Sequence, residues 1–515
     1  MQAALAGAVC FFLLLATAPI LPIVWDEGNA IERSDGILAW FADPHAWNAA
    51  GIESHWRYTT QVEGHPAFYG IVIAFGRVVS SPFLPPLLAA RFGPISLFSI
   101  ATGVLFWRVA RDVSRTAAVV AVASLLLLPR MFAHAHFASN DGPLVACWIL
   151  TWAAFTPTSF SWRRSFVWGL FLGMTLSAKA TGWLAVPPFV VWALVYRDRA
   201  AIVTLIVGVP AAILAFFLLN PPLWPAPVEG LIAFSRMNLF RGELWGLNIS
   251  ILFLGRMYNL DYPLPWWNTL FWTVIAVPVP ILAAAVIGLL STLREFRTDR
   301  FGMLLLFNWA VLLLARAVPG TPVHDGIRLF LPSFAFLAIF SGLGTDRLLR
   351  WASRRRPVFK ASIRGAVASA GVLMAANLGW YAPQWLSHYN LLIGGLPGAN
   401  AAGMEPTYYW DGLDGTVLDW LDTHTREEEM VRFGASSPTN IGLLRRWGRL
   451  KPNTDPDAPG RHRWYVIQNR PSGLSRADQE LLRTQRPAFV KRIRHGGWGP
   501  WRLEVPVVWV FEEEP

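Results

Sequence analysis

Long apolar runs alternate with short polar segments over the first three quarters of the chain. A bilayer core needs roughly 20 apolar residues per helix, and by this measure we predict about eleven spans. They lie near residues 3–24, 90–108, 117–133, 142–158, 165–178, 183–196, 201–219, 269–291, 301–317, 328–346 and 362–382. The pattern predicts an all-α polytopic membrane protein whose transmembrane domain covers residues 1–385.

The apolar runs stop after Ala382. Residues 386–515 carry charge runs, a helix-like stretch "TVLDWLDT" and the strand-like stretches "WYVIQN" (464–469) and "VVWVF" (507–511). Alternation of β-branched and aromatic residues is typical of strands. We therefore predict a small C-terminal α/β domain.

Lys and Arg along the chain predict the orientation in the membrane. Short cytoplasmic loops carry an excess of positive charge. The basic loops are 108–115, 162–164, 197–199, 294–300 and 346–360. If these face the cytoplasm, the first outer loop is 25–89, the long outer loop is 220–268, and the C-terminal domain is extracytoplasmic.

The apolar stretch 66–82 does not fit as a full span, because counting it would invert every later loop. We predict that it lies on or dips into the membrane, together with interfacial helices in the first outer loop. The N-terminal run lacks the positive start of a signal peptide, which favours an uncleaved anchor.

Composition agrees with this topology. The chain is 54% hydrophobic and 15% charged, and it holds 27 Trp. The net charge of +11 is explained by the inner loops and gives no reason to expect nucleic acid as a partner. Cys10 and Cys147 both lie in apolar runs, which argues against a disulfide framework. The sequence has no Walker motif or other nucleotide-binding pattern, so no nucleotide cofactor is expected.

Two adjacent carboxylates, Asp26 and Glu27, follow the first apolar run in "VWDEGNAI". Acidic residues there can be solvated groups at a helix N-terminus. Alternatively, one of them is a catalytic base held at the lipid surface. His65, in "EGHPAFYG", is either part of a plain turn or a phosphate partner.

Other ionisable residues lie at the outer ends of spans, where they are costly and call for a reason. In "HAHFASNDGPL" (134–144), His136 and Asp141 could bind a divalent cation, although helix capping is an equal alternative. Lys179 either snorkels to the interface or binds phosphate. His324 and Arg328, in "HDGIRLFLP", are candidates for phosphate binding, to which the guanidinium fork is suited.

Each of these signals is weak alone, but under the predicted topology they all face the outer side. Two explanations remain open. One is an enzyme acting on a membrane-borne phosphate. The alternative is a transporter or flippase of a lipid-linked or glycan substrate, although transporters place such groups near the midplane and often in repeated halves.

The order of several motifs resembles the C-type integral-membrane glycosyltransferases, in particular family 39, the protein O-mannosyltransferase-like enzymes and the lipid A aminoarabinose transferases. The motifs are "WDE", "HP" at 65–66, "FASNDGPL" (137–144), "LSAKATGWLAVPP" (176–188), "HDGIRLFLPSFAFLAIFSG" (324–342) and the stretch 387–413. The chain departs from the family in having His65 where Lys is commoner, and Phe137-Ala138 in place of an Arg-containing approach to Asp141.

This resemblance implies a hexosyl- or pentosyltransferase that moves a sugar from a polyprenyl-phosphate donor to a protein, lipid or glycan acceptor. Asp26 would be the base of an inverting displacement, with Glu27 as a second catalytic carboxylate. Glu27, Asp141 and His136 would hold a divalent cation, Mg²⁺ or Mn²⁺. The phosphate would contact His65, Lys179, Arg328 and His324. The expected location is the bacterial inner membrane, among membrane lipids, with the active site facing outward.

Overall fold

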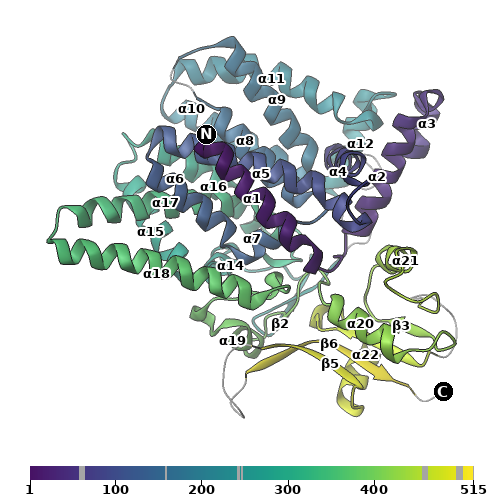
Figure 1. The fold of residues 1–515 in the computed structure, drawn as a ribbon. Coiled ribbons are helices and arrows are strands. Elements are labelled where there is room, and N and C mark those ends of the chain that lie inside the picture. Colours follow the sequence, from purple (N-terminus) through teal and green to yellow (C-terminus); the bar gives the residue numbers. More distant parts are fainter. Residues whose placement is uncertain are drawn as a thin grey trace.

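The computed structural model describes residues 1–56, 64–156, 159–240, 244, 248–454, 462–494 and 503–513. Helices make up the upper and left parts of the molecule in Figure 1, and the C-terminal sheet lies below them at the right. The helices of the predicted transmembrane domain are α1 (Gln2–Thr17), α5 (Pro86–Asp112), α6 (Arg115–Leu126), α7 (Pro129–His134), α8 (Asp141–Ala154), α9 (Trp162–Ala178), α10 (Val186–Val195), α11 (Arg199–Leu218), α14 (Asn268–Ala276), α15 (Val279–Arg294), α16 (Arg300–Ala317), α17 (Pro332–Ser353) and α18 (Pro357–Tyr381).

All the predicted spans fall on these helices, but several helices are shorter than predicted. Span 269–291 is divided into α14 and α15 at Pro278, which cannot continue a helix. Span 117–133 is divided before Pro129 for the same reason. Among the described residues, 5 helices are long and apolar enough to cross a membrane: Gln2–Ile20, Pro86–Asp112, Arg199–Leu218, Arg300–Ala317 and Pro357–Tyr381. The chain is thus an integral membrane protein in character, and the count of eleven crossings stays a prediction.

Small residues let the helices approach closely, as is common between membrane helices. A Cβ atom on Gly169 of α9 would lie 2.2 Å from the Gly208 carbonyl oxygen of α11. A Cβ atom on Gly344 of α17 would lie 1.8 Å from the Ala284 carbonyl oxygen of α15. Many apolar side chains remain exposed on the outside of the bundle, among them Phe12, Ile206 and Leu214, as expected where lipid is the solvent.

The described part of the segment predicted as the first outer loop forms α2 (Glu27–Ala42), α3 (Ala49–His55) and α4 (Phe68–Ser80). Helix α4 has 13 residues, short of the roughly 20 that a crossing needs. It packs on α5, where a Cβ atom on Gly76 would meet the Gly93 nitrogen at 2.3 Å. The long outer loop contributes α12 (Pro227–Leu239) and the hairpin β1 (Ile251–Phe253) and β2 (Arg256–Tyr258).

The C-terminal part forms a four-stranded sheet in the order β3-β4-β6-β5, in which only β3 and β4 are parallel. Its strands are β3 (Val431–Phe433), β4 (Trp464–Gln468), β5 (Phe489–Arg494) and β6 (Glu504–Glu512). Its helices are α20 (Gly415–His424), α21 (Pro438–Arg446) and α22 (Arg476–Thr484). We call the described residues of 415–513 the C-terminal unit. The short helix α19 (Gly395–Ala401) precedes it, and the domain boundary at residue 386 stays a prediction.

Candidate active site

Arg328 contacts three carboxylates, two of which come from distant parts of the sequence. It lies in the 3-10 turn Gly326–Phe330, just before α17, and is buried. Its Nε donates to Asp141 Oδ2 at 2.7 Å and its Nη1 to Asp325 Oδ2 at 2.8 Å. Its Nη2 contacts Asp26 Oδ2. The two acids that the sequence places 115 residues apart, Asp26 and Asp141, are therefore bridged by one guanidinium.

Asp26 is the accessible carboxylate of this cluster. It occupies the N-cap position of α2, and its side chain is 38% exposed, against 1% for Asp141. Tyr409 also donates a hydrogen bond to Asp26 Oδ2, at 2.8 Å. Within the described part of the chain both polar contacts of the carboxylate use Oδ2, which leaves Oδ1 available to a substrate.

Lys179 and Asp141 form the second pair of the cluster. Asp141 is the first residue of α8, where a negative charge interacts favourably with the helix N-terminus. Lys179 directly follows α9, and its ammonium donates to Asp141 Oδ1 at 2.5 Å. Both residues are buried. The apolar segments α8 and α9 thus bring together two charges that the sequence predicted at the outer ends of spans.

The structure does not support a substrate contact for Glu27. Its side chain is 0% exposed, and two hydrogen bonds of 2.8 Å join it to Arg91 of α5. It also accepts the backbone N–H groups of Val24 at 3.0 Å and Ala138 at 2.8 Å. Each carboxylate oxygen therefore has two donors, and the pair fastens the start of α2 to α5.

The three residues predicted as metal ligands point to different partners. Glu27 binds Arg91, and Asp141 binds Lys179 and Arg328. The ring of His136 bonds Thr17 Oγ1 at 2.8 Å and the Phe132 carbonyl oxygen at 2.7 Å. Among the described residues no group of three His, Cys, Asp or Glu side chains is placed to hold a metal ion. The donors present do not fit a Mg²⁺ or Mn²⁺ site, and no step below uses one.

The two predicted phosphate-binding histidines differ in their surroundings. His324 is half-buried beside Asp325, and burial above all lowers its pKa to about 4. Its imidazole is therefore neutral at pH 7 and supplies no positive charge. His65 lies half-buried in the loop just before α4, and its contact with a phosphate stays a prediction.

Aromatic residues line the cluster. The Arg328 guanidinium lies 3.9 Å from the Tyr409 ring centroid, and the rings of Trp25 and Trp410 are 4.1 Å apart. Burial above all keeps the pKa of Tyr409 well above its usual value, so its phenol stays protonated and acts as a donor. Burial alone would raise the pKa of Asp325, but the Arg470 charge holds it below its ordinary value.

Sequence analysis missed Arg91, Asp325, Tyr409 and Arg470 as site-forming residues. Asp325 and Tyr409 lie inside the quoted motifs "HDGIRLFLP" and 387–413, so the motifs held a signal that pointed to their neighbourhood. Arg470 and Arg91 gave no such signal, because a lone Arg next to a strand or in an apolar helix has many possible roles.

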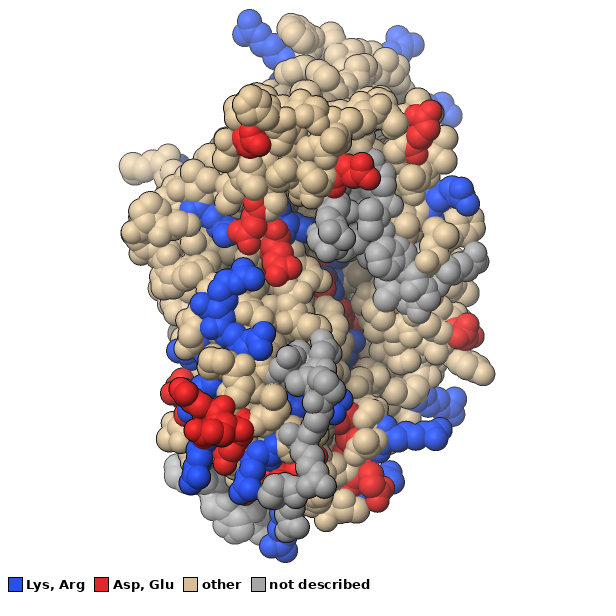
Figure 2. Space-filling model, turned by 90° about the vertical axis from the view of Figure 1, so that its right-hand side faces the viewer, with Lys and Arg blue, Asp and Glu red and all other residues tan. Residues whose placement is uncertain are grey.

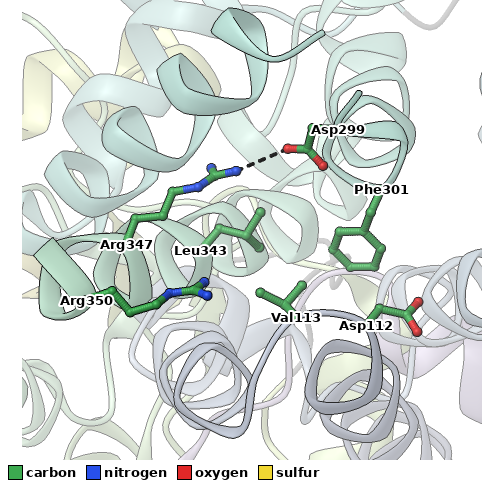
Figure 3. A pocket seen from close by; sticks show the side chains of 7 residues that line it. All are labelled: Asp112, Val113, Asp299, Phe301, Leu343, Arg347 and Arg350. Atoms are coloured by element: carbon green, nitrogen blue, oxygen red, sulfur yellow. Dashed lines mark hydrogen bonds and ion pairs between the residues drawn. The ribbon is translucent and has the colours of Figure 1, made fainter. Parts of the chain in front are cut away.

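The face drawn in Figure 2 is hollowed near its middle, and side chains of both charge signs are visible inside the hollow. A separate cavity of about 210 Å³ lies at the other end of the helices, where Arg347 pairs with Asp299 (Figure 3). Arg328 precedes the first residue of α17, and Arg347 lies about two thirds of the way along this 22-residue helix, about 22 Å of axial rise from its start. This cavity therefore belongs to the predicted inner face, away from Asp26.

Comparison with known proteins identifies the fold. The family model described as dolichyl-phosphate-mannose-protein mannosyltransferase matches residues 83–224, which include Arg91, Asp141 and Lys179. The structure of ArnT from Cupriavidus metallidurans bound to undecaprenyl phosphate matches with a TM-score of 0.53 at 16% identity, covering 98% of this chain and 97% of that one. The apo form of ArnT gives 0.52 at 15% identity with the same coverage. No curated protein matches the chain.

The archaeal oligosaccharyltransferase AglB from Archaeoglobus fulgidus matches with a TM-score of 0.47 at 11% identity, covering 91% of this chain and 69% of that one. The chain thus has the fold of ArnT. The predicted resemblance to the C-type integral-membrane glycosyltransferases is confirmed.

Proposed function

We propose that the protein is a membrane glycosyltransferase that takes a sugar from a polyprenyl-phosphate donor and transfers it to an acceptor at the extracytoplasmic face. The observation that carries the proposal is the convergence of Asp26, Asp141 and Lys179 around Arg328. A donor of this class has a prenyl chain, which needs hydrocarbon, and a phosphate, which needs cations. The ends of apolar helices that carry buried charges supply both environments. ArnT, with the same fold, binds undecaprenyl phosphate.

Asp26 is the residue we assign as the base. The acceptor hydroxyl gives its proton to Oδ1, and the acceptor oxygen attacks the anomeric carbon of the sugar. The bond from that carbon to the phosphate oxygen breaks, and its electron pair leaves with the polyprenyl phosphate. A single displacement inverts the configuration at this carbon. General-base help of this kind contributes roughly 10²–10⁴-fold in rate.

Lys179 is the better candidate for contact with the leaving phosphate. Its ammonium has three donors, and one of them binds Asp141. Arg328 uses three of its five N–H donors on three different carboxylates, so its charge is already shared among them, whereas Lys179 has one carboxylate partner. We therefore assign Arg328 to holding Asp26 in place, and Lys179 to stabilising the negative charge that develops on the phosphate.

The test uses the full-length protein in lipid nanodiscs with a panel of polyprenyl-phosphate hexoses and pentoses and a membrane-extract acceptor. Release of polyprenyl phosphate from one donor, dependent on the extract and lost in Asp26→Asn, is the expected result. Movement of an intact donor across a vesicle membrane without release would instead support a flippase. If no panel member loses its sugar, the proposal is contradicted for those donors.

A further inference from the structure

Asn440 of the C-terminal unit holds the loop that carries Asp26. It lies on α21, a helix that contacts α2 and is drawn below it in Figure 1, and its exposed fraction is 7%. Its Nδ2 donates to the Val24 carbonyl oxygen at 2.8 Å, and its Oδ1 accepts the Gly28 N–H at 3.0 Å. These two hydrogen bonds hold the backbone on both sides of Asp26. Gly28 is needed for this approach, because a Cβ atom there would lie 2.2 Å from Oδ1.

Arg470, just after β4, holds the loop that carries Arg328. It is 1% exposed and forms an ion pair of 3.1 Å with Asp325 Oδ1 and one of 3.4 Å with Glu405 Oε2. The other oxygen of Asp325 accepts from Arg328. Asp325 is therefore a bridge between the guanidinium of the site and a guanidinium of the C-terminal unit. The Arg470 guanidinium also lies 3.8 Å from the Trp410 ring centroid.

The end of β4 also fixes the segment that carries Tyr409. Thr407 Oγ1 donates to the Asn469 carbonyl oxygen at 2.7 Å, and the Gly412 N–H donates to Gln468 Oε1 at 2.9 Å. Between these anchors Tyr409 and Trp410 adopt φ values of 63° and 54°. Bulky residues are strained in this region of backbone conformation and persist there only where their surroundings hold them.

These contacts reach the three segments that meet at Asp26: its own loop, the Arg328 loop and the Tyr409 segment. A unit that only added stability to the fold would have no reason to concentrate its buried polar contacts there. We propose that the C-terminal unit completes the active site, and that Asn440 and Arg470 are positioning residues for Asp26 and for Arg328. We call the contacts of Asn440 with Val24 and Gly28, and of Arg470 with Asp325 and Glu405, the clamp. The clamp rests on geometry alone, and its effect on the active site rests on the proposed function.

The test compares Asn440→Ala and Arg470→Gln in the full-length protein in nanodiscs. The matched controls are Asn453→Ala and Arg449→Gln, which lie on the same unit. Asn453 Nδ2 donates to the Arg426 carbonyl oxygen, and Arg449 forms an exposed pair with Asp419. Hydrogen–deuterium exchange measures how firmly the clamped segments are held, and titration with undecaprenyl phosphate measures the affinity of the site.

For Asn440→Ala we expect exchange about tenfold faster in peptides covering 24–30. For Arg470→Gln we expect the same in peptides covering 323–329 and 405–412. Both variants should bind undecaprenyl phosphate about fivefold more weakly, while the controls keep the wild-type affinity and melting temperature. Asn440→Ala should keep the wild-type melting temperature within a few degrees, whereas Arg470→Gln removes the buried counter-charge of Asp325 and Glu405 and should also melt at a lower temperature. Unchanged exchange in these peptides for both variants, or equal changes in the controls, would overturn the inference.

Gly28→Ala provides a second route that leaves the C-terminal unit intact. The added Cβ atom meets Asn440 Oδ1, so the variant should show the same faster exchange and weaker binding as Asn440→Ala. Combining the two substitutions should be no worse than either one, whereas fully additive defects would contradict a shared contact. If wild-type protein fails to bind undecaprenyl phosphate, the proposed donor class is contradicted, and the exchange results still decide the clamp.

Discussion

Asp26 and Glu27 are consecutive acids, and each is paired with a buried arginine, yet their surroundings differ completely. Glu27 is 0% exposed and Arg91 satisfies it from one side while backbone N–H groups satisfy it from another. Asp26 is 38% exposed and shares Arg328 with two other carboxylates. Consecutive residues at a helix start point in directions about 100° apart, so Glu27 faces the core while Asp26 stays partly exposed. A pair of adjacent carboxylates need not be a catalytic pair.

The other hydrogen bonds of Arg91 strengthen this contrast between Glu27 and Asp26. Besides Glu27 it donates to the carbonyl oxygens of Ala18, Leu21 and Pro22, at 2.9, 3.0 and 2.6 Å. The guanidinium therefore ties the exit of the first membrane helix to α5 and leaves no donor for a ligand. Arg328 contacts only carboxylate side chains among its described hydrogen-bond partners, so it holds the acidic groups of the site in place and does not fasten the backbone.

The largest effect is expected from Glu27→Gln, which leaves the buried Arg91 without its counter-charge. Breaking a buried pair in this way costs about 3–5 kcal/mol. Thermal unfolding in detergent should shift sharply to lower temperature, and expression should fall. Glu32→Gln, an exposed acid on the same helix, is the control. A normal melting temperature for Glu27→Gln would show that the pair does not fasten α2.

The second-largest effect is expected from Lys179→Gln, on the affinity for undecaprenyl phosphate. Losing the charge nearest the proposed phosphate should weaken undecaprenyl phosphate binding about 30-fold, the lower part of the range for truncating a buried charge pair. Lys179→Arg keeps the charge and should retain most of the affinity. Equal affinity in Lys179→Gln and wild type, measured by titration in nanodiscs, would remove Lys179 from the phosphate site.

Tyr409→Phe should have a smaller effect. It removes one hydrogen bond to the Asp26 carboxylate, worth about 1.5 kcal/mol or roughly tenfold in rate. Because the ring and its stacking with Arg328 remain, binding of undecaprenyl phosphate should change little. The check is the transfer rate at saturating donor; a loss of binding with an unchanged rate would assign Tyr409 to donor recognition instead.

The smallest effect is expected from chelation. The predicted ligands Glu27, His136 and Asp141 are each committed to other partners. Treatment with EDTA followed by gel filtration should leave the transfer rate within about twofold of the untreated enzyme. Loss of activity that Mg²⁺ or Mn²⁺ restores would show that the site rearranges to take a metal.

The bundle was predictable because apolar runs mark helices whatever their neighbours are. Asp26, Asp141, Lys179 and Arg328 could be found because a charge at the end of an apolar run needs a reason. The direction of the Glu27 side chain could not be predicted, because it depends on a contact with Arg91, which lies 64 residues later in the sequence. Asn440 was equally hidden, because its partners Val24 and Gly28 lie about 400 residues away and nothing in its local pattern points to them.

In the proposed mechanism Asp26 takes the acceptor proton, Arg328 and Tyr409 hold Asp26 in place, and Lys179 stabilises the leaving phosphate. The most direct test of this mechanism is the single-turnover transfer rate of Asp26→Asn, measured beside its affinity for undecaprenyl phosphate. The account predicts a rate at least 100-fold below wild type, at the low end of general-base effects of about 10²–10⁴-fold, with near-normal affinity and melting temperature. A variant that transfers sugar at the wild-type rate would contradict it.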